Sequence, residues 1–380
     1  MYYDVVIAGG SIAGLLCARE ISHMGHSVLV LEEDHEIGTP EHCGGLVSIM
    51  ALDELGIIPH GKTFFNYIES AKVFSPTGKK FSIESRKQKV AEINRRELDK
   101  QIALQAKKNG TEIRVKTSFK GMTEDGINSS IGEIKCKIVV DARGVSSLIN
   151  KDRSGILSSA QYEIYADWIL KGTVEVYFDQ KKFPGFFAWI IPSANGIGKV
   201  GVAGKAINAA ETLEEFLSQK GNYSTIRKIF APIWIKGPID KFVSKNIVTI
   251  GDAAGQSKPT TAGGIFSCGI GGILAGQAIS KYLESGKKED LEQYQKLWLK
   301  KFGKEFEKQI LARKILERLD NTTINKLFES VTPEILKDIS NNDDFDFHTN
   351  SIIKLLGVKG TVKIAQIIMS REMKNLLSQN

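Results

Sequence analysis

Residues 3–14 read Tyr-Asp-Val-Val-Ile-Ala-Gly-Gly-Ser-Ile-Ala-Gly, an apolar run followed at once by a glycine-rich turn. The run from Tyr3 to Ala8 predicts a short buried strand, and the amphipathic pattern of residues 13–24 predicts a helix. A second apolar run, residues 27–32, completes a strand–helix–strand unit. The turn between strand and helix presents free N–H groups and the positive end of the helix dipole, and both favour a bound pyrophosphate.

This turn follows the dinucleotide-binding fingerprint, except that Ser11 stands where the middle glycine is usual. Glu32 ends the second strand about 20 residues further on, where a carboxylate accepts hydrogen bonds from ribose hydroxyls. The strand, the helix and the acidic residue compensate for the serine, so the sequence predicts dinucleotide binding. The residues expected to contact the dinucleotide here are Gly9, Gly10, Ser11, Ala13, Gly14, Glu32 and Glu33.

The composition is that of an ordinary globular protein, with 42% hydrophobic and 25% charged residues. At 380 residues the chain is longer than one typical domain, so we expect two domains and a helical appendage. The formal net charge of +7 favours anionic partners, and a solvated lysine-rich surface is an equally simple explanation. No nucleic-acid partner is predicted. No cleavable signal fits the N-terminus, where a strand is expected.

The four cysteines lie far apart, and no CxxC or histidine pair has metal-ligand spacing. We therefore expect no metal site, and reduced thiols in a cytoplasmic compartment. Residues 259–280 form an uncharged stretch nearly long enough to span a membrane. Because six of them are glycines, we interpret the stretch as a buried helix packed closely on a cofactor.

The rest of the pattern divides the chain into two kinds of sheet. Residues 38–48 predict a loop, and Asn94 is expected to cap a helix that runs to about Lys108. Aromatic-rich strands in residues 161–202 predict an antiparallel sheet, followed by a helical stretch near 213–230. Residues 247–252, Ile-Val-Thr-Ile-Gly-Asp, then return the chain to the first domain.

Two later segments resemble the second and third signatures of the para-hydroxybenzoate-hydroxylase-like flavoproteins. They are residues 137–144, which end in Asp-Ala-Arg-Gly, and residues 247–264. The resemblance implies that the dinucleotide is FAD and that a helix N-terminus faces the flavin, whose N1–C2=O edge gains negative charge on reduction. For Arg95 the resemblance implies an arginine that contacts the cofactor, and the alternative is an exposed arginine at the start of a helix. The cofactor contacts that the resemblance implies are Arg95, Asp141, Gly144, Gly251, Asp252, Pro259, Gly263 and Gly264.

The chain further resembles the geranylgeranyl reductase family, in particular its archaeal branch, which saturates the isoprenoid chains of ether lipids. The segments that carry the likeness are residues 42–48, His-Cys-Gly-Gly-Leu-Val-Ser, residues 161–164, residues 184–192 and residues 259–265. The resemblance implies a catalytic role for Cys43, with Cys43 and Gly44 close to the flavin. It also implies a substrate chamber lined by Phe187, Trp189 and Pro192. Two residues depart from the family pattern, Phe187 in place of Tyr and Ile191 in place of Phe.

Two of these features also have a purely structural interpretation. Cys43 is either an active-site residue or a small buried hydrophobe, and its glycine-flanked loop favours the active site. The aromatic residues around Trp189 would in most proteins be core.

The fold predicted from these features is α/β, with a discontinuous Rossmann-like FAD-binding domain, an antiparallel-sheet substrate domain and a helical C-terminal region. The FAD-binding domain is expected in residues 1–70, 91–158 and 240–290, the substrate domain in 71–90 and 159–239, and the helical region in 291–380.

The function predicted is reduction of C=C bonds in a geranylgeranyl chain, such as that of a prenylated glycerophospholipid. Hydride would come from reduced FAD, and the electron donor would be ferredoxin or NAD(P)H. The apolar substrate argues for a cytoplasmic protein that attaches peripherally to a membrane. The alternatives are a flavin-dependent monooxygenase of the same fold and a flavin protein that carries lipid or electrons without catalysis.

Overall fold

The computed structural model describes residues 2–149, 152–342 and 344–356. Its N-terminal unit is β1 (Tyr2–Ala8), α1 (Ile12–His23) and β2 (Val28–Leu31). The two strands are parallel, with Val6 opposite Leu29, and all four residues of β2 are buried. The predicted strand–helix–strand unit is therefore present.

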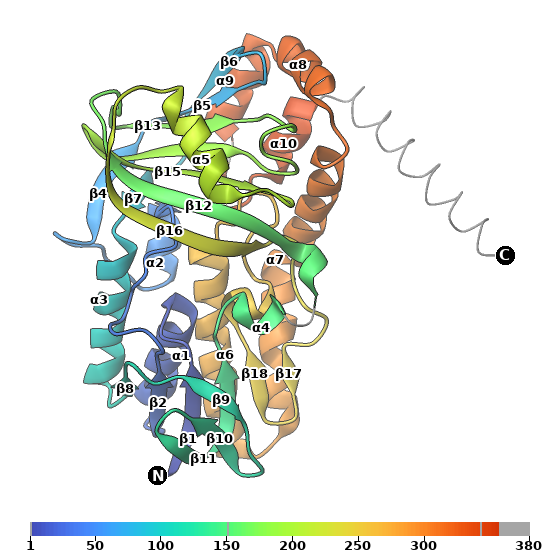
Figure 1. Ribbon diagram of the computed structural model, residues 1–380. Coiled ribbons are helices and arrows are strands. Elements are labelled where there is room, and N and C mark those ends of the chain that lie inside the picture. The colour runs from blue at the N-terminus through green and yellow to red at the C-terminus, as the bar shows by residue number, and fades with distance from the viewer. Residues whose placement is uncertain (1, 150–151, 343, 357–380) are drawn as a thin grey trace.

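Strands far apart in the sequence join β1 in one eight-stranded sheet, at the lower end of Figure 1. Strands β18, β11, β1, β2 and β8 run parallel to one another in that order. Strands β17, β10 and β9 add antiparallel pairs. The bounds are β8 (Glu112–Arg114), β9 (Phe119–Met122), β10 (Gly126–Ser129), β11 (Gly132–Asp141), β17 (Val243–Ser244) and β18 (Ile247–Thr249).

Helices cover one face of this sheet and antiparallel strands cover the other. The helical side carries α1, α3 (Arg95–Lys108), α6 (Ile265–Ser285) and α7 (Lys288–Leu316). On the opposite side, Ile127 and Ile134 of the β10–β11 hairpin pack on Val6 and Val139. As predicted, Asn94 caps α3, because its side chain accepts a hydrogen bond from the Glu97 N–H at 3.2 Å.

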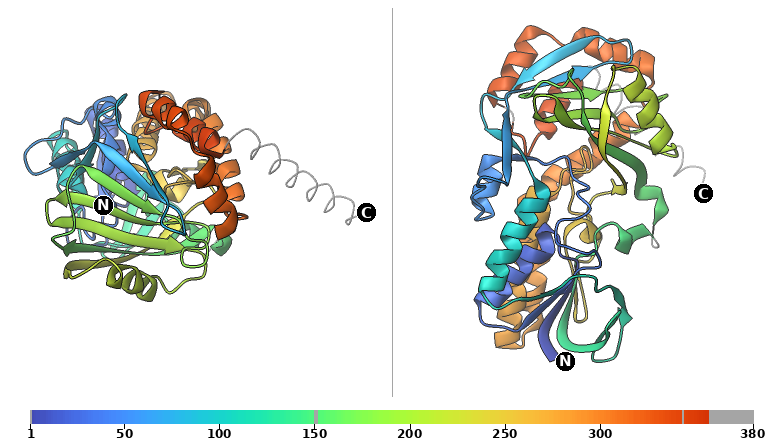
Figure 2. Two further views of the ribbon diagram at one scale, coloured as in Figure 1. Left: turned by 90° about the horizontal axis from the view of Figure 1, so that it is seen from above. Right: turned by 60° about the vertical axis from the view of Figure 1, so that its left-hand side comes forward.

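The second large sheet has seven strands in the order β16-β12-β15-β14-β13-β5-β6 and lies at the other end of the molecule (Figure 2). It was expected to be antiparallel, but β13 and β5 are parallel, because β5 comes from an early hairpin and enters the sheet beside a late strand. The bounds are β5 (Ser70–Phe74), β6 (Lys80–Glu84), β12 (Ile156–Tyr165), β13 (Thr173–Tyr177), β14 (Ala188–Ala194), β15 (Ile197–Gly204) and β16 (Ser224–Trp234).

Side chains alternate across this sheet, as the period of a strand requires. On β14, Ala188 and Ile190 pack beneath α5 (Ala209–Ser218), whereas Trp189 and Ile191 face the interior of the molecule. The sheet therefore presents one face to a helix and the other to the remainder of the protein.

Two predictions of local structure were wrong. The helical stretch near 213–230 ends at Ser218, and residues 224–234 form β16, an edge strand whose outer residues Ile226 and Phe230 are exposed and hide its strand pattern. The loop of residues 38–48 ends in β3 (Leu46–Ser48), which pairs with β7 (Val90–Ile93). Strand β4 (Phe64–Ile68) completes that three-stranded sheet, and α2 (Ile49–Glu54) follows β3.

The C-terminal part is helical, as predicted, and residues 357–380 lie outside the described residues. After α7 come α8 (Asn321–Ser330), α9 (Pro333–Asn342) and α10 (Thr349–Leu356). Helices α8 and α9 lie beside the β5–β6 hairpin, where Phe81 contacts Phe328 of α8 at 4.9 Å between ring centroids. The short helices are α4 (Ser146–Ile149), η1 (Arg153–Gly155) and η2 (Gly251–Ala254). In the part of the chain that is described, no helix has the length and hydropathy of a membrane span.

Glycine allows α6 to lie directly against α1. A Cβ at Gly272 would stand 2.2 Å from the Ala13 carbonyl oxygen, and one at Gly276 would stand 2.8 Å from that of Cys17. The two helix backbones are therefore in contact. This explains the glycines of residues 259–280, which the sequence analysis assigned to a closely packed buried helix.

Gly272→Ala should lower the free energy of unfolding by about 2 kcal/mol, because the new methyl group forces the helices apart. Gly303→Ala in α7 is the matched control, since its Cβ would meet nothing closer than 3.8 Å. This control should stabilise the protein by about 0.5–1 kcal/mol through helix propensity. Thermal unfolding of both variants tests the contact, and equal behaviour of the two would contradict it.

Candidate active site

A cavity of about 1090 Å³ lies between the two large sheets. The glycine turn after β1 lines one part of it, and Phe187 and Trp189 line another. Residues 41–45, which we call the Cys43 loop, line it as well. One cavity therefore joins the predicted cofactor residues to the predicted substrate residues.

The glycine turn is held by backbone contacts and by Glu32. Gly9 has φ +114°, and a Cβ there would stand 2.3 Å from the Ala142 carbonyl oxygen. The Gly10 N–H donates to Glu32 Oε2 at 2.8 Å, and burial raises the pKa of Glu32 although this bond opposes the shift. Ser11 makes no capping hydrogen bond, so the first N–H groups of α1 are left for solvent or a ligand.

The third signature brings an acidic residue to the start of α6. Asp252 is half-buried, and desolvation raises the pKa of its carboxyl group, opposed by hydrogen bonds with Cys268 and Ser257. Cys268 Sγ lies 3.4 Å from Asp252 Oδ1. This contact was not predicted, since Cys268 falls within the glycine-rich helical pattern and stands in no motif.

Arg95 is only 8% exposed, so the alternative of an exposed helix-start arginine is wrong. Its Nη2 donates to both carboxylate oxygens of Asp99, at 3.0 and 3.1 Å. Burial lowers the pKa of the guanidinium, but the interactions with Asp99 and Cys43 together outweigh this effect and hold the pKa above its usual value. Its Nε is buried without a hydrogen-bond partner. Arg95 is thus a fixed cation beside the cavity, close to the Cys43 side chain and with an unused Nε–H.

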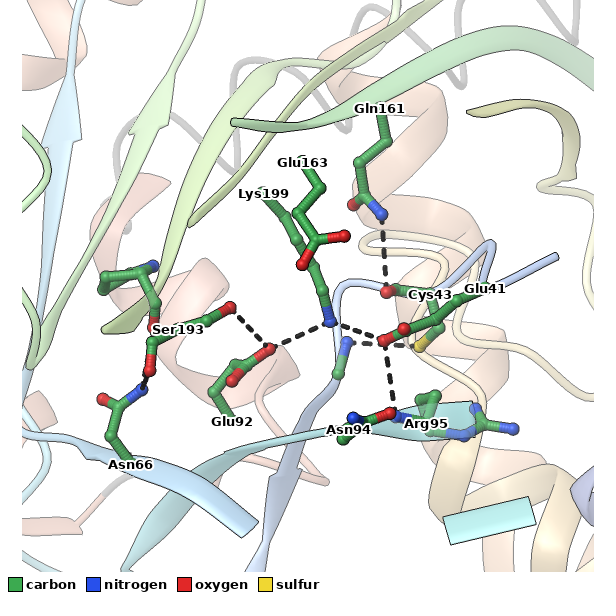
Figure 3. Close-up of polar contacts among 12 residues, drawn as sticks. Glu41, Cys43, Asn66, Glu92, Asn94, Arg95, Gln161, Glu163, Ser193 and Lys199 are labelled. Carbon is green, nitrogen blue, oxygen red and sulfur yellow. Dashed lines mark hydrogen bonds and ion pairs between the residues drawn. The ribbon is translucent and has the colours of Figure 1, made fainter. Parts of the chain in front are cut away.

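Cys43 is half-buried and is connected to the aromatic wall through one glutamine. Gln161 Nε2 donates to the Cys43 carbonyl oxygen at 3.4 Å, and Trp189 Nε1 donates to Gln161 Oε1 at 3.1 Å (Figure 3 shows the first contact). Gly45 N–H donates to Cys43 Sγ at 3.4 Å. The thiol therefore lies in a loop whose backbone is bonded to the substrate-side sheet.

The aromatic wall is closely packed. Phe186 and Phe187 are stacked with ring centroids 4.1 Å apart, and Trp189 meets both rings edge-on. A Cβ at Gly201 of β15 would stand 2.2 Å from the Trp189 indole. The ring therefore lies flat over a glycine of the neighbouring strand, and the absence of a side chain there fixes its position.

Most predicted site residues line the cavity, and four do not. Gly14 lies under the turn, where a Cβ would be 2.1 Å from the Gly9 carbonyl oxygen. Asp141 is paired with Arg143 at 2.8 Å. Pro259 accepts a hydrogen bond from Arg313, and Pro192 accepts one from Asn66. The predicted residues that line the cavity are Gly9, Gly10, Ser11, Ala13, Glu32, Glu33, Cys43, Gly44, Arg95, Gly144, Phe187, Trp189, Gly251, Asp252, Gly263 and Gly264.

No family model matches the chain. The chain is 32% identical over 357 residues to the digeranylgeranylglycerophospholipid reductase of Methanocaldococcus jannaschii, with 87% of this chain and 90% of that protein covered. It is 30% identical to digeranylgeranylglycerophospholipid reductase 2 of Methanothermobacter thermautotrophicus, with 90% of this chain and 94% of that protein covered. The chain belongs to the geranylgeranyl reductase family.

Solved structures place this family member in a wider fold. A geranylgeranyl bacteriochlorophyll reductase-like protein from Thermoplasma acidophilum has a TM-score of 0.86 at 22% identity, covering 97% of this chain and 99% of that chain. A flavin-dependent brominase has a TM-score of 0.66 at 18% identity, covering 98% and 100%. The mixed α/β architecture is thus that of FAD-dependent oxidoreductases, and the family assignment makes the chain an enzyme.

The C-terminal segment of this family member also reaches the cavity, which the sequence analysis did not foresee. Phe345, Asp346 and His348 line it, and Ser48 Oγ donates to Asp346 Oδ2 at 2.5 Å. Burial lowers the pKa of His348 to about 3, so the imidazole is neutral. No sequence motif marks these residues, because their place depends on the path of α7.

A buried charge cluster lies behind the Cys43 loop and was also missed (Figure 3). Lys199 Nζ lies 2.7 Å from Glu41 Oε1 and 2.9 Å from Glu92 Oε1. Burial raises the pKa of Glu92 to about 7, although Lys199 opposes the shift. The three residues belong to separate segments, and none stands in a motif.

The Glu92 titration should make stability depend on pH. The carboxyl group binds its proton more tightly in the folded state, where its pKa is about 7, than in the unfolded state, where it is 4.5. The free energy of unfolding should therefore fall as pH rises from about 4.5 to about 7, by up to about 3 kcal/mol. The other charged groups nearby are Lys199, Glu41 and, beyond them, Arg227 and Glu163.

Glu92→Gln should remove this fall, because the amide does not titrate. Chemical unfolding at pH 5 and pH 7.5 measures the difference, with Glu69→Gln, an exposed position, as the control. A pH dependence that is the same in both variants would contradict the assignment to Glu92.

Proposed function

We propose that the chain is an FAD-dependent reductase that saturates C=C bonds of geranylgeranyl chains in membrane lipid precursors. The observation that carries the proposal is the single cavity that joins the glycine turn, the Cys43 loop and an apolar aromatic wall. The family relatives named as digeranylgeranylglycerophospholipid reductases support the substrate class.

The residues present fit an FAD molecule. The pyrophosphate would lie on the turn around Gly10, where the start of α1 has free N–H groups, with Glu32 nearby for the ribose. Gly144 has open space beside its Cα, and Arg95 offers an unused buried donor. Bound FAD supplies the two-electron hydride chemistry that none of these side chains can supply.

The sheet membership supports the proposed domain division. Strands of residues 1–70, 91–158 and 240–290 make up the sheet of β1 and the small sheet of β4, whereas residues 71–90 and 159–239 supply nearly all of the sheet of β12. The wall of that second sheet would hold the alkene at about 3–3.5 Å from the reacting centre and exclude water from it.

Cys43 is the proposed catalytic residue. Its half-buried thiol lies in a glycine-flanked loop between the turn and the wall, which favours an active-site role over packing. The electron donor, ferredoxin or NAD(P)H, and peripheral attachment of a cytoplasmic protein to a membrane remain part of the proposal. The net charge of +7 suits an acidic donor and an anionic bilayer.

A reduction assay tests the function. Under anaerobic conditions, with chemically reduced FAD and a geranylgeranyl lipid, the product should gain two hydrogens for each double bond saturated, as measured by mass spectrometry. Heavy water should label the protonated carbon. The Cys43→Ala variant, expected to fold and to bind FAD, should be slower by about tenfold or more.

The same assay separates the alternatives. The fold neighbours include flavin-dependent brominases and an FAD-dependent monooxygenase, so an oxygen-dependent reaction is the competing function. If the lipid is unchanged without oxygen but acquires an oxygen atom in air, the protein is a monooxygenase and the reductase proposal is wrong. A lipid that binds but is unchanged under both conditions would favour a carrier.

The cofactor has its own test. Gly14→Val should abolish FAD binding, because the side chain would collide with the Gly9 carbonyl oxygen and displace the turn. Flavin absorbance per protein measures the loss, and circular dichroism checks that the remainder is folded. Gly121→Val in β9, at a position with nothing within 4 Å of the added Cβ and no positive φ, is a control for a substituted glycine away from the cavity. Full FAD occupancy in Gly14→Val would show that the pyrophosphate site is elsewhere.

A further inference from the structure

The mechanism proposed above leaves unexplained a buried ion-pair cluster. Lys199 is 3% exposed and lies on β15, on the face that carries Gly201 and faces the cavity side of the sheet. Glu41 is 8% exposed and Glu92 is fully buried. We propose that Lys199 is a positioning residue, which holds the Cys43 loop in its working conformation through Glu41 and Glu92. This inference rests on the proposed function.

The two carboxylates that bind Lys199 lie at the two ends of the Cys43 loop. Glu41 is the first residue of the loop, and Lys199 holds its carboxylate at 2.7 Å. Glu92 lies on β7 directly opposite Leu46, the residue at which the loop passes into β3. A single ammonium group therefore fixes the start of the loop relative to the strand beside its end (Figure 3).

The loop backbone lies directly on this ion pair. A Cβ at Gly45 would stand 3.2 Å from both Lys199 Nζ and Glu92 Oε1, and 2.4 Å from the Ile93 carbonyl oxygen. Gly45 has φ +83°, and its carbonyl oxygen accepts a hydrogen bond from Ile93 N–H at 2.9 Å. Any shift of the ion pair would therefore move the Gly45 backbone.

Gly45 in turn sets the position of the thiol, because its N–H donates to Cys43 Sγ. The other side of the loop is held by Gln161, which binds the Cys43 carbonyl oxygen. The contacts form a continuous path from Lys199 through Gly45 to Cys43. A positioning role follows from this path, since Lys199 itself does not line the cavity.

The charge balance makes stability a poor reason for the cluster to exist. Two carboxylates share one ammonium, and Glu92 Oε2 is buried without a partner. Buried ion pairs with incomplete hydrogen bonding are costly, and apolar residues of the same size often stabilise a protein more. Glu41 also accepts from the Arg95 N–H at 3.3 Å and lies 3.9 Å from Arg227, so it ties three elements together at the loop.

The test measures the loop through its thiol. Among the described residues Cys43 is the one cysteine that is not buried, so a neutral maleimide should label it first. Lys199→Met should raise the rate of Cys43 labelling by about tenfold or more, because a loop that is no longer held opens more often and exposes the thiol. Lys199→Arg should restore much of the wild-type rate. Cys43→Ala protein gives the background.

Two further variants protect the test against misfolding. Leu213→Ala in α5 is the stability control, since it removes buried apolar surface far from the loop and should leave labelling unchanged. If Lys199→Met does not fold, Glu41→Gln keeps the Lys199–Glu92 pair and weakens the contacts of Glu41 with Lys199 and Arg227 at the start of the loop. It should shift labelling in the same direction.

Activity adds a second readout. Lys199→Met should lower kcat by about tenfold with a smaller change in KM, because the lipid wall is intact while the thiol is misplaced. Labelling and kcat at the wild-type values, with only thermal stability reduced, would overturn the inference. If the labelling rate shifts but the wild-type protein reduces no lipid, the positioning role of Lys199 stands and the proposed function is wrong.

Discussion

Backbone contact through glycine is the constraint on which the rest of the structure depends. The absence of a side chain at Gly14 lets α1 lie against the turn after β1, and its absence at Gly9 lets that turn lie against Ala142 after β11. Gly272 lets α6 pack directly against α1. These contacts bring the first and third signatures together, although more than 200 residues separate Gly14 from Gly251, where a Cβ would be 3.0 Å from Ala13 Cβ. A bulkier residue at these positions would separate these backbone segments and change the shape of the cavity.

The sequence predicted what local patterns and motifs encode. The glycine turn, the Asn94 cap and the strand ending at Asp141 were found because each depends on neighbours in the chain. The charge cluster was not predicted, because Glu41, Glu92 and Lys199 come from distant segments and meet only in the folded protein. The strand β16 was mistaken for helix because an edge strand exposes residues such as Phe230, which removes the alternation that identifies a strand.

The aromatic wall of the cavity carries little polarity, in contrast to the part near the glycine turn. Asp252 and Arg95 lie at the end near the glycine turn, and each has a partner that limits the cost of burial. Phe187, Trp189 and Ile191 present only one polar hydrogen, the indole N–H, and Gln161 accepts it. A substrate that is apolar over its length suits that wall.

A shared fold does not select one reaction, since brominases and monooxygenases have the same architecture. The selection must come from side chains, and here the two candidate features are connected. Trp189 of the wall binds Gln161, and Gln161 binds the backbone of Cys43. A substitution that reshaped the wall for another substrate would therefore also displace the loop. The position of Trp189 and the position of the Cys43 backbone are thus coupled through one glutamine.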